Sequence, residues 1–322
     1  MMDPEVSLLL HCAAWRGLRQ SQVQVELSER YNRHTDAALQ RHIEEVWNVR
    51  VSKEPWLFDG AKFRLQSFHI DLPAAHVSSC TPSSQNPDST QGQAIAPLLT
   101  LKIGLTSYKD YLGTNWSCQA AELRRRGEGE FGSSWALLAQ PLGVGGVVCT
   151  GDGQVVFIRR SQQVAEAGGK LDLPGGHPEP KVACERLGEE KIDMNLLERN
   201  PEAVVTELFL SICAEIRDEV NIPLSALGEP LLMGVALNDI GAGKPSAAFY
   251  ISCSLSSDKV RELYWKGGAE ANESTDIVFL SRAETLRLNG SSPMWLELCP
   301  SAKGAVLLFQ TVKPEQLGSC SI

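Results

Sequence analysis

Four acidic side chains crowd an apolar stretch in the second half of the chain, ELFLSICAEIRDEVNI, which ends at Ile222. They are Glu207, Glu215, Asp218 and Glu219. On an α-helix all four would share one arc of about 120°, because successive side chains are about 100° apart. Glu215 and Glu219 are one turn apart, a spacing at which two carboxylates can bind a hard divalent ion such as Mg²⁺. The stretch therefore predicts either a metal site or an ordinary solvated helix face.

The charge pattern of this stretch favours the metal site. A solvated face usually places Lys or Arg four residues from its acids, because like charges at that spacing destabilise a helix. Arg217, the single cation of the stretch, would point away from the acidic arc, with Cys213 and Asn221 as its neighbours at that spacing. We therefore expect the acids to repel one another, which would raise at least one carboxyl pKa in the metal-free protein.

Strands and turns before the acidic helix would bring further groups to it. The segment KLDLPGGHPEP predicts a strand and then a turn whose two glycines permit close backbone approach. Before it, WALLAQPLGVGGVVCT and QVVFIRR predict two strands, and the GDG between them predicts a tight hairpin turn. The turn and the acidic helix would therefore belong to one folded unit.

The remainder of the chain predicts an α/β fold with a mixed sheet flanked by helices. LLMGVAL, AAFYISCSL and DIVFLS predict strands, whereas SSDKVRELYW and SRAETLRL predict surface helices. Near the C-terminus, apolar spacing on both sides of Pro300 predicts two helical pieces, with Ser301 as the N-cap of the second.

A smaller β-rich region precedes residue 140. FRLQSFHIDL and PLLTLKIGLTSY predict paired strands, and their connection near residues 78–97 is rich in Ser, Pro and Gln, which predicts a disordered loop. A charged segment near residues 180–200 predicts an insertion. We therefore predict an N-terminal domain of residues 1–140 and a second domain of residues 141–322.

Charge and composition limit the ligands and the surroundings of the protein. The net charge of −9 argues against binding nucleic acid through a broad basic surface. No apolar run reaches the ~18 residues of a membrane span, and the N-terminus does not resemble a signal peptide. The nine cysteines include no CxxC pair, which favours buried reduced thiols. We expect a cytoplasmic protein, with the nucleus as an alternative, that binds neither nucleic acid nor membrane.

The Pro-Gly-Gly turn and the acidic helix together resemble the signature of the Nudix hydrolases. PGGHPE supplies the turn and Glu179, and AEIRDEVNI supplies the metal-binding Glu-any-any-Asp/Glu-Glu core. The resemblance covers about residues 141–312 and implies a Nudix-type α/β/α sandwich. Five features depart from the signature. About thirty residues separate Gly176 from Glu207, where the family has five, and Ala214 replaces the family's Arg. Asp218 replaces a Glu, Asn221 replaces the late Gly, and Glu207 is one residue closer to Glu215 than in the family.

Other segments are similar to one animal branch of this family, which hydrolyses UDP-glucose and UDP-galactose. They are WLFDGAKFRL, GLTSYKDYLGTNW, RRSQQVAEA and CPSAKGA. This resemblance implies hydrolysis of UDP-sugars to UMP and sugar 1-phosphate with Mg²⁺, or with Mn²⁺ as the alternative ion, and a substrate-recognition role for residues 1–140. Two alternatives stay open: another nucleoside diphosphate conjugate as substrate, or a non-catalytic nucleotide-binding module, which Ala214 would favour. The oligomeric state also stays open.

The resemblance implies catalytic roles for all four acids of the helix. Glu215 and Glu219 would bind the metal, against the alternative of surface acids. Glu207 and Asp218 would be water-mediated ligands, or one of them would be the general base. The spacing alone does not separate these roles.

Substrate-binding roles follow in the same way, each with a structural alternative. Phe58 and Tyr108 would stack on uracil, or lie in a core. Arg160 would bind the diphosphate through its guanidinium, or form an ion pair at a strand end. His177 would contact the phosphate or the sugar, or be an ordinary turn residue.

Three further residues complete the predicted substrate site. Asp172 would accept hydrogen bonds from sugar or ribose hydroxyls, or cap a turn. Ser301 would lie at a helix N-terminus whose amides could meet an anion or a ribose hydroxyl. Ala165 would contribute backbone groups.

Overall fold

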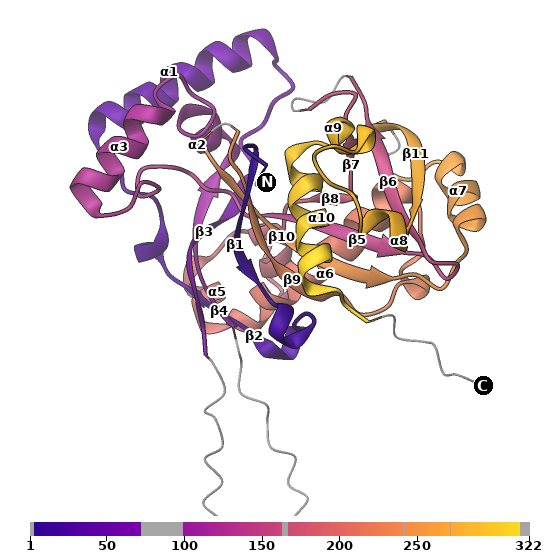
Figure 1. Ribbon diagram of the computed structural model, residues 1–322. Helices are drawn as coiled ribbons and strands as arrows, with labels where there is room; N and C mark the ends of the chain where they lie inside the picture. The colour runs from indigo at the N-terminus through magenta and orange to yellow at the C-terminus, as the bar shows by residue number, and fades with distance from the viewer. Residues whose placement is uncertain (1–2, 72–98, 163–166, 241, 271, 316–322) are drawn as a thin grey trace, which may run out of the picture.

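A large mixed β-sheet lies at the centre of the molecule (Figure 1). The computed structural model describes residues 3–71, 99–162, 167–240, 242–270 and 272–315. Its strands are β1 (Val6–His11), β5 (Gly143–Cys149), β6 (Gln154–Arg160), β7 (Leu171–Asp172), β8 (Gly175–Gly176), β9 (Leu231–Asn238), β10 (Lys244–Ser252) and β11 (Ser274–Ser281). The order is β1-β9-β10-β5-β6-β11, with β7 paired to β6 and β8 paired to β5. β10 and β5 are parallel, whereas β9 and β10 are antiparallel, so the sheet is mixed as predicted.

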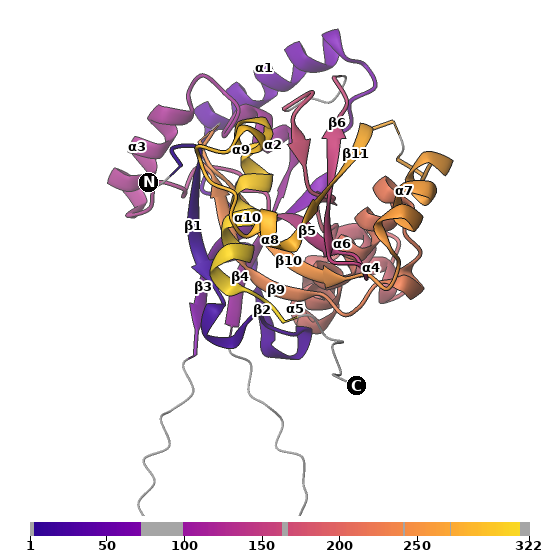
Figure 2. The same ribbon diagram turned by 45° about the vertical axis from the view of Figure 1, so that its right-hand side comes forward.

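Both faces of this sheet are covered by helices (Figure 2). Successive side chains of β6 alternate between two core clusters, because a strand presents its residues to opposite faces. Val156 and Ile158 pack in the cluster that includes residues of α6 (Pro201–Val220), whereas Val155 and Phe157 pack in the cluster that includes residues of α10 (Pro300–Val312). The predicted α/β/α sandwich is therefore confirmed. Gly153 has a φ of 79°, as expected for the hairpin turn between β5 and β6.

A second sheet of three strands contains β2 (Val23–Leu27), β3 (Ala61–Ile70) and β4 (Leu99–Ser107), in the order β2-β4-β3. β3 and β4 are antiparallel, as predicted, and the connection predicted near 78–97 lies outside the described residues. Phe63 and Ile103 of this sheet share a core cluster with α6. The division near residue 140 stays a prediction, but one N-terminal strand, β1, pairs with β9 and so lies in the large sheet.

The other helices are α1 (Ala37–Lys53), α2 (Tyr108–Gly113), α3 (Ala120–Phe131), α4 (Pro180–Arg186), α5 (Met194–Arg199), α7 (Ser257–Lys266), α8 (Arg282–Thr285) and α9 (Pro293–Glu297). Short 3₁₀ turns are η1 (Ala13–Trp15), η2 (Gln20–Gln22), η3 (Glu29–Tyr31) and η4 (Leu224–Ala226). The segment predicted as an insertion thus forms α4 and α5. None of the helices in the described ranges is long and apolar enough to cross a membrane.

The predicted N-cap of α10 is wrong. Cys299 occupies the N-cap position and Pro300 is the first helical residue, so Ser301 lies one residue inside the helix. Proline is favoured at that first position, because its φ already suits a helix and its missing N–H would have no intrahelical partner there. Ser301 therefore has no capping role, and its hydroxyl donates to the Asp172 carboxylate instead.

Candidate active site

The four predicted site acids of α6 do not form a solvated face. Glu207 and Glu219 are only 3% and 4% exposed, and Glu215 and Asp218 are half-buried. Our expectation that Arg217 would point away from the acidic arc is wrong, because its guanidinium donates to both carboxylate oxygens of Asp218, at 2.7 and 2.6 Å. Of the four acids, Glu215 and Glu219 have no ion-pair partner among the described residues.

The Pro-Gly-Gly turn packs directly on these two carboxylates. The Gly175 N–H donates to Glu219 Oε2 at 2.9 Å, and the His177 backbone donates a hydrogen bond to Glu215. A Cβ added at Gly176 would lie 2.0 Å from Glu215 Oε1. Glycine is therefore required at position 176 for the turn and the Glu215 carboxylate to occupy their places together.

Two further acids, Glu270 and Glu273, reach the site from the loop between α7 and β11. The Glu270 N–H donates to the carbonyl oxygen of Asp218 at 3.0 Å, and the Glu273 carbonyl accepts from the Ser161 N–H at 2.7 Å. Sequence reasoning missed both acids. Their only signal is two glutamates three residues apart in the run GGAEANEST, and nothing in that run indicates contact with a helix fifty residues earlier.

Burial and mutual repulsion raise the carboxyl pKa values, as expected. The pKa of Glu215 rises to about 7, first because it is buried and then because Glu270 and Glu273 lie nearby. Burial raises the pKa of Glu219 well above its usual range, and Glu215 adds to that rise. The pKa of Glu270 is also raised, by burial and then by Glu273. The site therefore has an excess of negative charge that a cation would relieve.

The donor set fits a hard divalent cation that takes further ligands from water or from a bound phosphate. Among the described residues, no group of three or more His, Cys, Asp or Glu side chains is arranged to hold a metal by itself. Mg²⁺ in enzymes is commonly bound by one or two carboxylates, with waters and substrate phosphates completing the octahedron. Glu215 and Glu219 are the two carboxylates that could hold such an ion, with hard oxygen donors of the type that it prefers.

The raised pKa of Glu215 predicts how the metal-free protein responds to pH. The pKa of this carboxyl is about 7 in the folded protein, against an ordinary value of 4.5, so between these values the folded state holds a proton that the unfolded state releases. The resulting stabilisation is complete below about pH 4.5 and is lost as the pH rises through 7, with a magnitude on the order of 2–3 kcal/mol.

We expect E215Q to remove this dependence. In EDTA, the melting temperature of E215Q minus that of the unchanged protein should increase from pH 5 to pH 8, because only the glutamate loses its proton. Thermal unfolding followed by circular dichroism checks this difference, and excess Mg²⁺ should abolish it at pH 8. Parallel curves for the two proteins in EDTA would contradict the raised pKa of Glu215.

A pocket of about 280 Å³ lies beside the turn, and five of the predicted substrate residues line it. They are Tyr108, Arg160, Asp172, His177 and Ser301. Glu273 and Lys244 line the same pocket. The structure thus brings together residues that are as much as 193 positions apart, since Tyr108 and Ser301 face one space.

The polar end of this pocket contains a network centred on Asp172. Arg160 forms an ion pair with Asp172 at 2.9 Å, and the Ser301 hydroxyl donates to the same carboxylate at 3.2 Å. The Leu173 N–H also donates to Asp172, at 2.9 Å. Arg160 is therefore partly neutralised by Asp172, and the predicted ion pair at the strand end is present alongside any role in binding phosphate.

A second pocket, of about 360 Å³, adjoins the first and is mainly aromatic. Trp56, Phe58 and Tyr111 line it, and Tyr108, His177 and Lys244 line both pockets. Phe58 is 77% exposed, so the alternative that places it in a core is wrong. Tyr108 is half-buried between the two pockets.

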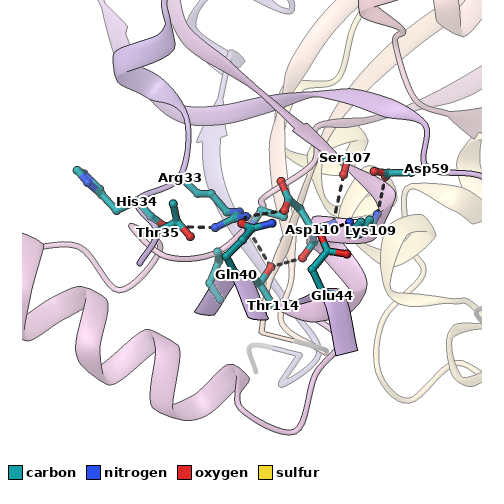
Figure 3. Close-up of polar contacts among 12 residues, drawn as sticks. Arg33, His34, Thr35, Gln40, Glu44, Asp59, Ser107, Lys109, Asp110 and Thr114 are labelled. Atoms are coloured by element: carbon teal, nitrogen blue, oxygen red, sulfur yellow. Dashed lines mark hydrogen bonds and ion pairs between the residues drawn. The ribbon is translucent and has the colours of Figure 1, made fainter. Parts of the chain in front are cut away.

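Polar contacts fix the aromatic pocket (Figure 3). The Lys109 N–H donates to Asp59 Oδ1 at 2.9 Å, which attaches the loop after Phe58 to the beginning of α2. Asp110 of the same helix forms an ion pair with Arg33 at 2.6 Å. The loop that carries Phe58 and the helix that carries Tyr108 are thus held together.

His177 lies between two lysines at the junction of the pockets. Burial lowers the pKa of His177 well below its usual range, and Lys244 and then Lys62 lower it further. The imidazole is therefore neutral at physiological pH and can accept as well as donate a hydrogen bond. Sequence reasoning missed both lysines, because neither belongs to the signature. The predicted residue Ala165 lies outside the described part of the chain.

Several curated proteins are similar to the chain over nearly its whole length. It is 47% identical over 317 residues to the Mus musculus uridine diphosphate glucose pyrophosphatase NUDT22, covering 98% of this chain and 94% of that protein. It is 45% identical over 318 residues to the Homo sapiens protein of the same name, covering 99% and 96%. Nudix hydrolase 9 of Arabidopsis thaliana is 31% identical over 304 residues, covering 91% and 89%.

The chain matches family models and solved structures less well than it matches these relatives. No protein-family model matches the chain. The crystal structure of the MutT protein from Methanosarcina mazei Go1 aligns with a TM-score of 0.33 and 15% identity, covering 54% of this chain and 95% of that one.

Proposed function

The chain belongs to the Nudix hydrolase family, and from that premise we propose that it hydrolyses the diphosphate of UDP-glucose and UDP-galactose to UMP and sugar 1-phosphate, with Mg²⁺. One observation carries the proposal. Two carboxylates without ion-pair partners among the described residues, Glu215 and Glu219, contact the turn that lines the first pocket, which has a polar end and adjoins the aromatic pocket. A nucleotide sugar has the same sequence of parts: an aromatic base, a charged diphosphate and a polyhydroxylated sugar.

The charges around the pockets support one orientation of the substrate. When bound, the metal neutralises the diphosphate and polarises its phosphoryl oxygens. Lys244 and His177 lie where the two pockets meet, which suits a diphosphate between base and sugar. The base would stack in the aromatic pocket with Phe58, and Asp172 and Ser301 would receive sugar hydroxyls.

The general base is best assigned to Glu273. The two candidates from the sequence are each engaged in an ion pair, Glu207 with Arg186 at 3.0 Å and Asp218 with Arg217 at 2.6 Å. Glu273 instead lines the pocket, where it can accept a proton from an attacking water. We expect E273Q to lower kcat by roughly 10²-fold or more, the usual range for a lost general base. A kcat of E273Q within tenfold of the unchanged protein would contradict this assignment.

Truncating Phe58 should weaken substrate binding more than it slows the reaction. Aromatic stacking contributes about 0.5–1.5 kcal/mol, so F58A should raise KM for UDP-glucose by roughly three- to tenfold, with kcat nearly unchanged. Because the side chain is 77% exposed, its loss should not affect folding. Steady-state kinetics check this, with F131A as the control, since Phe131 is also exposed but lies at the end of α3. Equal KM values for F58A and F131A would contradict the stacking role.

A panel of nucleotide sugars in ¹⁸O-labelled water tests the proposed function. We expect turnover of UDP-glucose and UDP-galactose to UMP and hexose 1-phosphate, with the label in one of the two products. Equal kcat/KM values for ADP-glucose and UDP-glucose would remove the UDP assignment. No turnover of any diphosphate in the presence of Mg²⁺ would favour a non-catalytic binding module.

A further inference from the structure

The inserted segment contributes a cation to the most buried acid of α6. Glu207 is 3% exposed, and its Oε2 lies 3.0 Å from the guanidinium of Arg186, the last residue of α4, in an ion pair that lacks hydrogen-bond geometry. Its other oxygen, Oε1, accepts from the Glu179 N–H at 3.0 Å. Both partners therefore come from the stretch that separates the Pro-Gly-Gly turn from the helix.

The helix has no cation of its own for this acid. Ala214 lies two turns after Glu207 on the same face of α6, and Arg217 is engaged with Asp218. A buried carboxylate without a cationic partner is strongly disfavoured. Arg186 therefore supplies the cation that the helix lacks at Ala214, where the family's signature has an arginine.

The Glu207 contacts lead directly to the proposed metal ligands. Glu179, which donates to Glu207, is three residues after Gly176, and Gly176 abuts the Glu215 carboxylate. The Lys62 ammonium holds the same Glu179 at 2.8 Å from the side of the aromatic pocket. The short segment from Gly176 to Glu179 is thus fixed at both ends, by Glu215 and by Glu207.

We propose that Arg186 is a positioning residue for the metal site: by holding Glu207, it fixes the turn of residues 176–179 against Glu215. This inference rests on the proposed function only in that Glu215 and Glu219 bind the divalent ion. Arg186 lines neither of the two pockets, so its role would be exerted through Glu207. Residues 180–200 are then a structural part of the active site.

Metal binding without substrate provides the test. Mn²⁺ has an electron paramagnetic resonance signal that falls when the ion binds, so its affinity can be measured on the resting protein. We expect R186M to raise the Kd for Mn²⁺ by about 10- to 100-fold, the usual effect of losing an outer-shell partner. R186K should recover part of the affinity, and R199M should bind as the unchanged protein does, because Arg199 is an exposed arginine of the same segment.

The outcomes separate this inference from the proposed function. If the unchanged protein binds Mn²⁺ and R186M binds it equally well, the positioning role is wrong while the function stands. If the unchanged protein binds no Mn²⁺ and hydrolyses no UDP-sugar, the proposed function is wrong. Should R186M fail to fold, R186K decides, because it keeps Glu207 and a positive charge but loses the guanidinium: weaker Mn²⁺ binding by folded R186K supports the inference, and unchanged binding overturns it.

Discussion

Replacing Glu219 by Gln is expected to lower kcat for UDP-glucose by on the order of 10³-fold, because a bound metal ion supplies several kcal/mol of charge stabilisation to the transition state. The amide keeps an oxygen that can accept the Gly175 N–H, now at 2.9 Å from Glu219 Oε2, so the turn should stay in place. Initial rates at saturating substrate and Mg²⁺, with circular dichroism on the same samples, would measure both effects.

The melting temperature of E219Q is expected to rise, whereas its activity is expected to fall. Burial raises the pKa of Glu219 well above its usual range, so its charge opposes folding when no metal is present. E219Q should therefore melt at a higher temperature than the unchanged protein in EDTA at pH 8, even though it is inactive. A variant that lost activity by unfolding would show the reverse.

A matched control is available on the same helix. Glu202 lies in the first turn of α6 and is exposed, so E202Q changes the same side chain without touching the site. We expect E202Q to keep its activity and its melting temperature. If E219Q retained more than a tenth of the activity of E202Q, Glu219 would not be a metal ligand.

The acidic helix α6 and the sandwich around it could be predicted from the sequence, because both depend on local periodicity. The spacing of Glu215 and Glu219 on one helix face, and the alternation of apolar residues in the strands, are properties of short windows. The position of Arg217 could not be predicted in this way. A helical wheel places its Cβ correctly, but the long side chain turns back to its neighbour Asp218.

The contacts that complete the site join distant parts of the chain, and their residue types carry no local signal. Glu270 and Glu273 approach α6 because Glu270 hydrogen-bonds to the end of that helix, a contact set by the packing of α7. Lys62 reaches Glu179 across 117 positions. In the sequence, Arg186 is one of many charged residues in the insertion. Its pairing with the buried Glu207 carboxylate is visible only in the structure.

Replacing Gly176 by Ala is expected to remove most of the activity while leaving the fold intact. The added methyl would lie 2.0 Å from Glu215 Oε1 and 2.4 Å from its Cδ, so the carboxylate must move. Displacing a catalytic group by about 1 Å can cost on the order of 10²-fold in rate. The atoms nearest to this methyl belong to the far end of a flexible side chain, so the melting temperature should change little.

Two other glycine variants show whether the loss comes from the site or from the fold. In G175A the methyl would lie 2.4 Å from the backbone oxygen of Val144, which cannot move without disturbing β5, so this variant should lose stability. In G129A nothing lies within 4 Å, and alanine is favoured over glycine in α3 by about 1 kcal/mol, so activity should be kept and stability slightly raised. Normal activity in folded G176A would show that Glu215 tolerates displacement, and Glu215 would then not be a metal ligand. Low activity with an unchanged melting temperature would point to the position of that carboxylate as the cause, because the three atoms nearest to the added methyl all belong to Glu215.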